Sequence, residues 1–125
     1  MRHKLTENAK LGELKEILEA RVLGSEGVSF TEIESISASD LMSDVLAFAK
    51  EGSLLLTGLV NQQVVRTAEM AGITAICFVR GKMPPKETIM LAKEKNIPLL
   101  ATELSLYEAS GRLYEKGLRG YDETK

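Results

Sequence analysis

From about residue 33 onward, the chain alternates between short unbroken apolar runs and segments in which apolar residues recur at helical spacing. The clearest unbroken run, Ile73–Val79, is nearly all apolar and contains β-branched and aromatic residues. Such runs are typical of strands buried on both faces of a parallel sheet. The pattern predicts strands over residues 33–37, 53–57, 74–79 and 98–101, the last being short because Pro98 fits only at its start or on a sheet edge.

Each predicted strand is followed by apolar residues three or four positions apart, which indicates the buried face of a helix. After the first strand, this face comprises Leu41, Val45, Phe48 and Ala49. Cap-forming and helix-ending residues flank all four segments. Helix starts are predicted at Ser39, Asn61, Pro85 and Ser105, the last with Glu108 as a capping box, and helix ends at Gly52, Gly72, Asn96 and Gly117.

Strands that alternate with helices predict a parallel sheet with right-handed crossovers. The residues before them predict a short amphipathic helix containing Leu11, Leu14 and Leu18, and then a hairpin in which Val22-Leu23 pairs with Val28–Phe30. We therefore expect an α/β fold of three layers. It has a mostly parallel sheet of four or five strands flanked by helices, with an N-terminal helix and a short hairpin. Residues 1–125 are expected to form a single domain.

Charge and composition narrow the range of partners. Sixteen basic and 18 acidic residues are interleaved along the chain and give a net charge of −2, so a general nucleic-acid-binding surface is not expected. No apolar run reaches the length that crosses a bilayer, and no apolar signal segment follows the basic start. Cys77 is the sole cysteine, which excludes an internal disulfide. We expect a cytoplasmic protein without a membrane partner.

The sequence lacks the common catalytic motifs. Gly81-Lys82 is followed by Met83 and has no glycine five residues upstream, so it is not a phosphate-binding P-loop. The single histidine, His3, has no evident nucleophile to activate, and Cys77 lies in the most apolar strand, where an inert buried thiol is expected. Asp40 and Asp44 could hold a metal or act as acid and base, but the favoured explanation is that they complement the dipole of the helix that follows. We predict no catalytic residue, no metal site and no cofactor.

The remaining candidate site follows from the fold. In open α/β sheets, ligands bind beyond the carboxyl ends of the strands and against helix N-termini. The loops predicted at that edge carry hydroxyls, an amide, small residues and two cations, which could hold an anionic metabolite or a nucleotide phosphate. Capping residues and solvated cations are the alternative explanation. The predicted ligand-binding residues are Thr57, Gly58, Asn61, Arg80, Gly81, Lys82, Thr102 and Ser105.

The loop and strand sequences carry a resemblance to a known family. Ile73–Gly81, Pro84-Pro85 and Asn96–Leu100, followed by Thr102 and Ser105, resemble the DRTGG domain and the related N-terminal domain of HPr kinase/phosphorylase. Ser39–Val45, followed by Ala49–Gly52, is similar to small stand-alone members of that group. The resemblance covers roughly residues 10–118. The sequence departs from the family pattern at Leu59-Val60, where an acid–arginine pair is expected, and at Val79-Arg80-Gly81, where Thr-Gly-Gly is expected.

The resemblance implies a non-catalytic regulatory or ligand-sensing domain that acts on a partner enzyme and associates with copies of itself. Kinase activity is not implied, because the P-loop is missing. We expect a homodimer, with Met42, Leu46 and Met90 as apolar residues that could form the contact. The alternative is a protein–protein interaction or dimerisation module that binds no small ligand.

Overall fold

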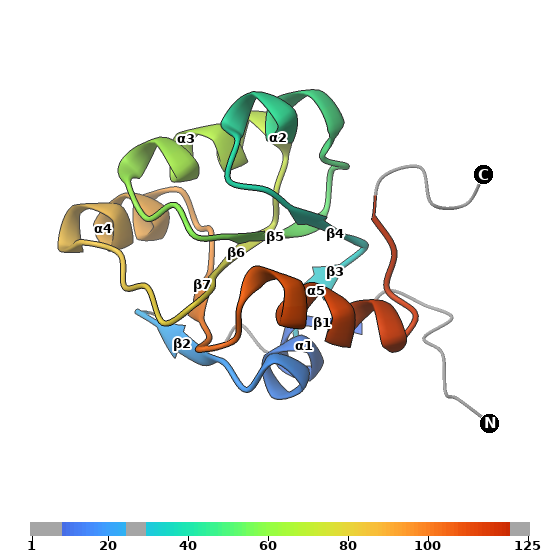
Figure 1. The fold of residues 1–125 in the computed structure, drawn as a ribbon. Coiled ribbons are helices and arrows are strands. Elements are labelled where there is room, and N and C mark those ends of the chain that lie inside the picture. The colour runs from blue at the N-terminus through green and yellow to red at the C-terminus, as the bar shows by residue number, and fades with distance from the viewer. Residues whose placement is uncertain (1–8, 25–29, 121–125) are drawn as a thin grey trace.

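The computed structural model describes residues 9–24 and 30–120 (Figure 1). In chain order its elements are β1 (Ala9–Lys10), α1 (Leu11–Leu18), β2 (Arg21–Leu23), β3 (Glu32–Ile33), β4 (Ser35–Ala38), α2 (Met42–Phe48), β5 (Ser53–Thr57), α3 (Gln62–Ala71), β6 (Ala75–Phe78), α4 (Lys86–Glu94), β7 (Leu99–Ala101) and α5 (Leu106–Glu115). The predicted N-terminal helix and the four strand–helix pairs are all present. The strand ends differ from the prediction by a residue or two.

The main sheet has five strands in the order β2-β7-β6-β5-β4. Strands β4 to β7 are parallel neighbours in chain order, and β2 lies antiparallel to β7 at one edge. The two-residue strands β1 and β3 pair with each other outside this sheet. The predicted mostly parallel sheet of four or five strands is therefore confirmed.

The helices form two layers around the sheet, with α2, α3 and α4 on one face and α1 and α5 on the other (Figure 1). Successive residues of a strand point to opposite faces, and β5 divides accordingly. Leu54 and Leu56 pack in the cluster that includes α1 and α5, whereas Leu55 packs with α2, α3 and α4. Because both faces are covered, every residue of β5 is buried, which explains the unbroken apolar runs.

The predicted buried face of α2 was right for Val45 and Ala49, which pack in the core, but wrong for Leu41 and Phe48. The helix begins at Met42, and its buried residues are Met42 and Val45, whereas Leu41 and Phe48 are 58% and 55% exposed. The chain stays extended through Ser39, whose N–H donates to the carbonyl of Leu56, so it turns into a helix later than the predicted cap at Ser39. This shift rotates Met42 into the core and removes it from the predicted self-association face.

The predicted hairpin was also wrong. The partner of β2 among the described residues is β7, where Val22 pairs with Leu100, and Phe30 lies in a turn. Residues 28 and 29, the rest of the predicted second strand, are outside the described ranges. The apolar pattern identified β2 as a strand, but it could not show that its partner lies near the other end of the chain.

The four predicted helix-ending residues all adopt the left-handed backbone conformation that favours Gly and Asn. Gly72 is the C-cap of α3, with φ of 74°, and Asn96 follows α4, with φ of 59°. Gly52 lies further from its helix, because α2 ends at Phe48. At Gly52, Gly72 and Asn96, this conformation turns the chain back toward the next strand of the sheet.

Candidate functional site

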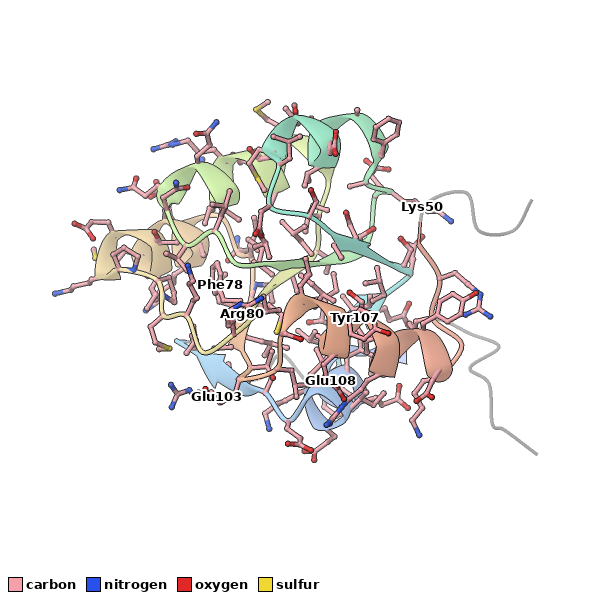
Figure 2. The ribbon with its side chains drawn as sticks, in the orientation of Figure 1. Lys50, Phe78, Arg80, Glu103, Tyr107 and Glu108 are labelled. Carbon is pink, nitrogen blue, oxygen red and sulfur yellow. The ribbon has the colours of Figure 1, made fainter. Side chains whose placement is uncertain are left out.

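The predicted site lies where β5, β6 and β7 end. The chain leaves β6 toward α4 on one face of the sheet and leaves β7 toward α5 on the other (Figure 1). Two neighbouring parallel strands that send the chain to opposite faces form a topological switch point, which is the usual ligand position in open α/β sheets. Figure 2 shows Arg80 and Glu103 at this end of the sheet.

The loop after β5 is held by a carboxylate of the same chain. Oδ1 of Asp40 accepts hydrogen bonds from Oγ1 of Thr57 at 2.8 Å and from the backbone N–H of Gly58 at 2.7 Å. The same Thr57 hydroxyl accepts from the N–H of Leu59 at 3.2 Å. A hydroxyl and a peptide N–H are the donors expected to bind an anionic ligand, and here Asp40 already binds both. Asn61, at the start of α3, is exposed.

In the loop after β7, as in the loop after β5, a threonine hydroxyl accepts a hydrogen bond from the N–H two residues further on. Oγ1 of Thr102 donates to the carbonyl of Leu18 at 2.6 Å and accepts from the N–H of Leu104 at 3.2 Å. Thr102 is buried, and its hydroxyl connects the residue after β7 to the last residue of α1. Ser105 is the N-cap of α5, where its Oγ accepts from the N–H of Glu108 at 3.1 Å. Both hydroxyls serve the fold, so their predicted contact with a ligand stays a prediction.

The loop after β6 carries the two cations of the predicted site. Arg80 has φ of 62°, a left-handed conformation that is uncommon for a residue with a side chain. Its N–H donates to the carbonyl of Leu104 at 2.7 Å, and the N–H of Gly81 donates to the carbonyl of Thr102 at 2.9 Å. These two bonds join the loops that leave toward opposite faces. The side chains of Arg80 and Lys82 are exposed.

Glu103 limits the space beside these cations. A Cβ atom placed on Gly81 would lie 2.6 Å from Oε1 of Glu103, so the Glu103 side chain would have to move, and the φ of 69° at Gly81 favours glycine in any case. A hollow of about 210 Å³ opens next to it, between these loops and the segment after α1. Within it, Nη2 of Arg21 lies 3.3 Å from Sδ of Met83. The hollow is lined by Glu19, Ala20, Arg21, Gly81, Met83, Ala101, Thr102 and Glu103.

Other candidate chemistry is limited. Cys77 is buried in β6, and burial raises the pKa of its thiol to about 12, so it remains protonated and unreactive near neutral pH. Asp40 lies before α2 rather than within it, and Asp44 occupies the first turn, where it complements the helix dipole. Residues 9–24 and 30–120 contain no cluster of three or more metal-ligating side chains. His3 lies outside the described ranges.

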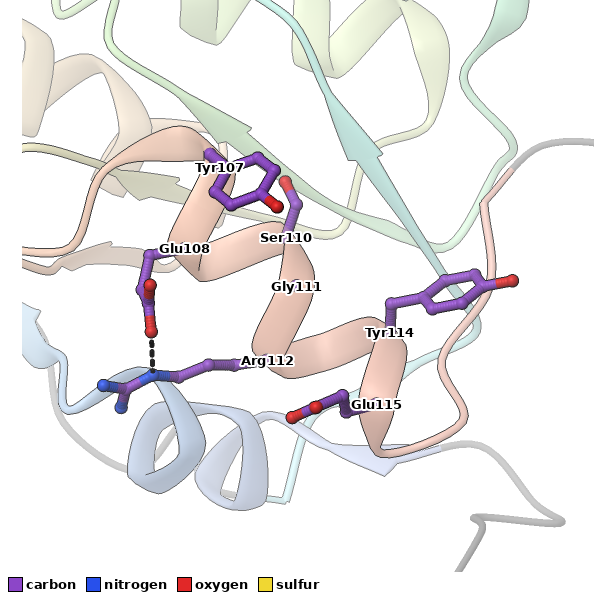
Figure 3. A pocket seen from close by; sticks show the side chains of 7 residues that line it. All are labelled: Tyr107, Glu108, Ser110, Gly111, Arg112, Tyr114 and Glu115. Carbon is purple, nitrogen blue, oxygen red and sulfur yellow. Dashed lines mark hydrogen bonds and ion pairs between the residues drawn. The ribbon is translucent and has the colours of Figure 1, made fainter.

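Larger hollows lie on the helices. One of about 660 Å³ runs between α3 and α4 and includes Arg66 and Met90. Another, of about 580 Å³, follows the outer side of α5 and is lined by Tyr107, Ser110, Gly111 and Tyr114 with charged neighbours (Figure 3). No described helix is both long and apolar enough to cross a membrane.

Sequence reasoning missed two features. The role of Asp40 depends on β4 and β5 being neighbours, which the acidic spacing alone did not reveal. The aromatic face of α5 was detectable, because Tyr107 and Tyr114 are seven residues apart and so lie on one side of a helix. Neither tyrosine lies on the buried face of α5, which contains Ala109 and Leu113, so the apolar pattern did not identify them.

Comparison with known proteins agrees with this fold. The DRTGG domain family model matches residues 13–115. A solved structure of the CBS and DRTGG domains of the regulatory region of Clostridium perfringens pyrophosphatase, complexed with its activator diadenosine tetraphosphate, is similar, with a TM-score of 0.67 and 18% identity. The match covers 92% of this chain and 52% of that one, so this chain spans about half the length of its structural neighbour. Curated protein sequences gave no significant match. Since the family model matches most of its length, the chain belongs to the DRTGG domain family.

Proposed function

We propose that this chain is a non-catalytic regulatory domain that binds a small anionic metabolite or nucleotide at the carboxyl edge of its sheet. The proposal rests on the exposed side chain of Arg80. This side chain stands at the switch point and, among the described residues, makes no hydrogen bond or ion pair. The same holds for the side chains of Asn61 and Lys82. A guanidinium and an ammonium on one loop are suited to phosphate or carboxylate groups.

The predicted site then divides into supporting residues and contact residues. Thr57 and Gly58 are bound by Asp40, and Thr102 and Ser105 are engaged within the chain. We assign these four residues, with Gly81, to shaping the edge. Asn61, Arg80 and Lys82 are the groups left to bind a ligand directly.

Two observations support this function over an enzymatic one. The structural neighbour is a regulatory region complexed with an activator that carries four linked phosphates. In addition, the thiol of Cys77, the one cysteine, is buried and protonated. The hydroxyl of Thr57 lies beside the carboxylate of Asp40, but Thr57 is fully buried and its hydroxyl is not open to a substrate.

Thermal shift assays with diadenosine tetraphosphate, ATP, acetyl phosphate and pyruvate test this proposal. A ligand at 100 times its Kd stabilises the folded state by about 2.7 kcal/mol, which is readily measured. Arg80→Gln should weaken the response at least about tenfold, because it removes a charge-assisted hydrogen-bonding group. Lys50→Gln is the matched control, since Lys50 is an exposed cation before β5, at the opposite end of that strand (Figure 2). A flat response to all four compounds would refute ligand sensing at this edge.

We further propose that the domain acts as a homodimer. Of the apolar residues predicted for this contact, Leu46 and Met90 are 46% and 59% exposed, while Met42 is buried. Met70 on α3, in the same layer of helices as Leu46 and Met90, is 70% exposed as well (Figure 1). Exposed apolar side chains favour self-association when they gather on one face. Sedimentation velocity from micromolar to near-millimolar concentration tests this, and a monomer throughout would refute it.

A further inference from the structure

The hollow beside Gly81 is too small to enclose a whole nucleotide-sized ligand. Pockets that enclose drug-sized molecules usually measure about 300–1,000 Å³, whereas this hollow measures about 210 Å³ and has room for part of such a ligand. Gly81 forms part of its wall and lies between Arg80 and Lys82 in the chain. An anion held by these two cations therefore has space for its remaining part next to Gly81. The groups that line the hollow decide what that part can be.

One carboxylate of the hollow is free to bind a ligand. Glu103 is exposed and, among the described residues, its side chain makes no hydrogen bond or ion pair. The other acid of the hollow, Glu19, is paired with Arg112 at 3.0 Å. Oε1 of Glu103 lies close against Gly81, within 2.6 Å of the position that a Cβ would occupy. Because an ionised carboxylate only accepts hydrogen bonds, Glu103 is suited to the hydroxyl groups of a ligand and repels a phosphate.

The same hollow contains a cation and apolar surface. Nη2 of Arg21 lies 3.3 Å from Sδ of Met83, and a thioether is only a weak acceptor, so this contact leaves the guanidinium charge unpaired. Ala20 and Ala101 add methyl groups to the wall. A small space thus offers a donor, an acceptor and apolar contacts. A sugar ring matches this set, because its hydroxyls donate and accept while its C–H groups are apolar.

We infer that the ligand of the carboxyl edge is a phosphorylated ribose, with its phosphate on Arg80 and Lys82 and its vicinal hydroxyls on Glu103. This inference rests on the proposed function and narrows its ligand to an anion with sugar hydroxyls. Two neighbouring hydroxyls can donate to the two oxygens of one carboxylate, and an acidic residue binds the ribose hydroxyl of nucleotides in other α/β folds. Acetyl phosphate and pyruvate lack such hydroxyls, so nothing offsets their repulsion from Glu103.

Isothermal titration calorimetry on the full chain with paired ligands tests the inference. ATP and 2′-deoxy-ATP differ by one ribose hydroxyl, and tripolyphosphate carries the charge without a sugar. The wild type should bind ATP at least about tenfold more tightly than either, because a hydroxyl bonded to a carboxylate is lost. Ribose 5-phosphate and AMP separate the two sources of the group. Tighter binding of AMP indicates a nucleotide, and binding of AMP no tighter than ribose 5-phosphate indicates a sugar phosphate.

Variants of Glu103 show whether its carboxylate is the group that selects the ligand. In Glu103→Ala the preference for ATP over 2′-deoxy-ATP should fall from about tenfold to less than about twofold, while tripolyphosphate should bind more tightly because a negative charge is removed. A purely structural role of Glu103 would not change this ratio. Glu94→Ala is the matched control, since Glu94 is an exposed carboxylate at the last residue of α4 and should leave the ratio unchanged.

The outcomes separate this inference from the proposed function. Equal affinity of the wild type for ATP and 2′-deoxy-ATP would overturn the inference, and so would a preference that survives in Glu103→Ala. If Arg80→Gln still weakens the binding of both nucleotides in that case, the proposed function stands. Failure of every ligand to bind, tripolyphosphate included, would refute both.

Discussion

The carboxylate of Asp40 should stabilise the fold by joining two neighbouring strands at the edge where ligands are expected. Asp40→Ala leaves the buried hydroxyl of Thr57 and the N–H of Gly58 without the acceptor that each contacts within 2.8 Å. Hydrogen bonds to a charged group contribute about 1.5–3 kcal/mol each when buried. Because Asp40 is exposed, we take the lower end and expect a total loss of about 2–3 kcal/mol. For a domain of this size that corresponds to a fall in Tm of roughly 10 °C.

Urea unfolding followed by circular dichroism would measure this loss as a lower midpoint at unchanged slope. Asp44→Ala is the control, since Asp44 lies in the first turn of α2 and a dipole interaction at the surface accounts for only about 0.3–1 kcal/mol. Asp40→Asn keeps an acceptor oxygen and should fall between the two. A double-mutant cycle with Thr57→Val should give a coupling energy of at least about 0.5 kcal/mol. Equal losses for Asp40→Ala and Asp44→Ala would contradict the assigned role.

Two further predictions concern the sheet and its edge. Burial raises the pKa of Cys77 from 9.0 to about 12. Its contribution to the free energy of unfolding is therefore complete below pH 9 and is lost as the pH rises toward 12. Relative to its own stability at pH 7, Cys77→Ala should lose less unfolding free energy over this pH range than the wild type. Native Cys77 should also resist thiol reagents until urea is added. Gly81→Ala should lower the free energy of unfolding by about 1–3 kcal/mol, because φ is 69°, a conformation that is strained for alanine. Unfolding at the wild-type midpoint would disprove this.

The fold class was predictable because it depends on repeated local signals. Ile73–Val79 is apolar at nearly every position since β6 is covered on both faces, and Gly72 and Asn96 mark helix ends through their own backbone preference. The failures required knowledge of distant partners. The strand at Val22 pairs with β7 rather than with the following segment, and the buried face of α2 depends on where the chain is held beside β5.

The sequence could predict where the candidate site lies, but not which of its polar groups already make hydrogen bonds within the fold. Helix and strand order placed Thr57, Arg80 and Thr102 at one edge. Residue types could not indicate which polar groups were already used, because that depends on contacts across the fold. Oγ1 of Thr102 bonds to the carbonyl of Leu18, 84 positions away, and no local pattern encodes that pairing.

The two backbone bonds that join Arg80 to Leu104 and Gly81 to Thr102 have a consequence for binding energetics. A loop that is free in solution must be ordered when it closes on a ligand, and the lost conformational entropy is subtracted from the affinity. Here the backbone at the switch point is fixed by folding itself, so that entropy is lost before any ligand arrives. A ligand would need to immobilise only the side chains of Arg80 and Lys82. On the proposed function, a small anion would therefore need few contacts to bind this edge with useful affinity.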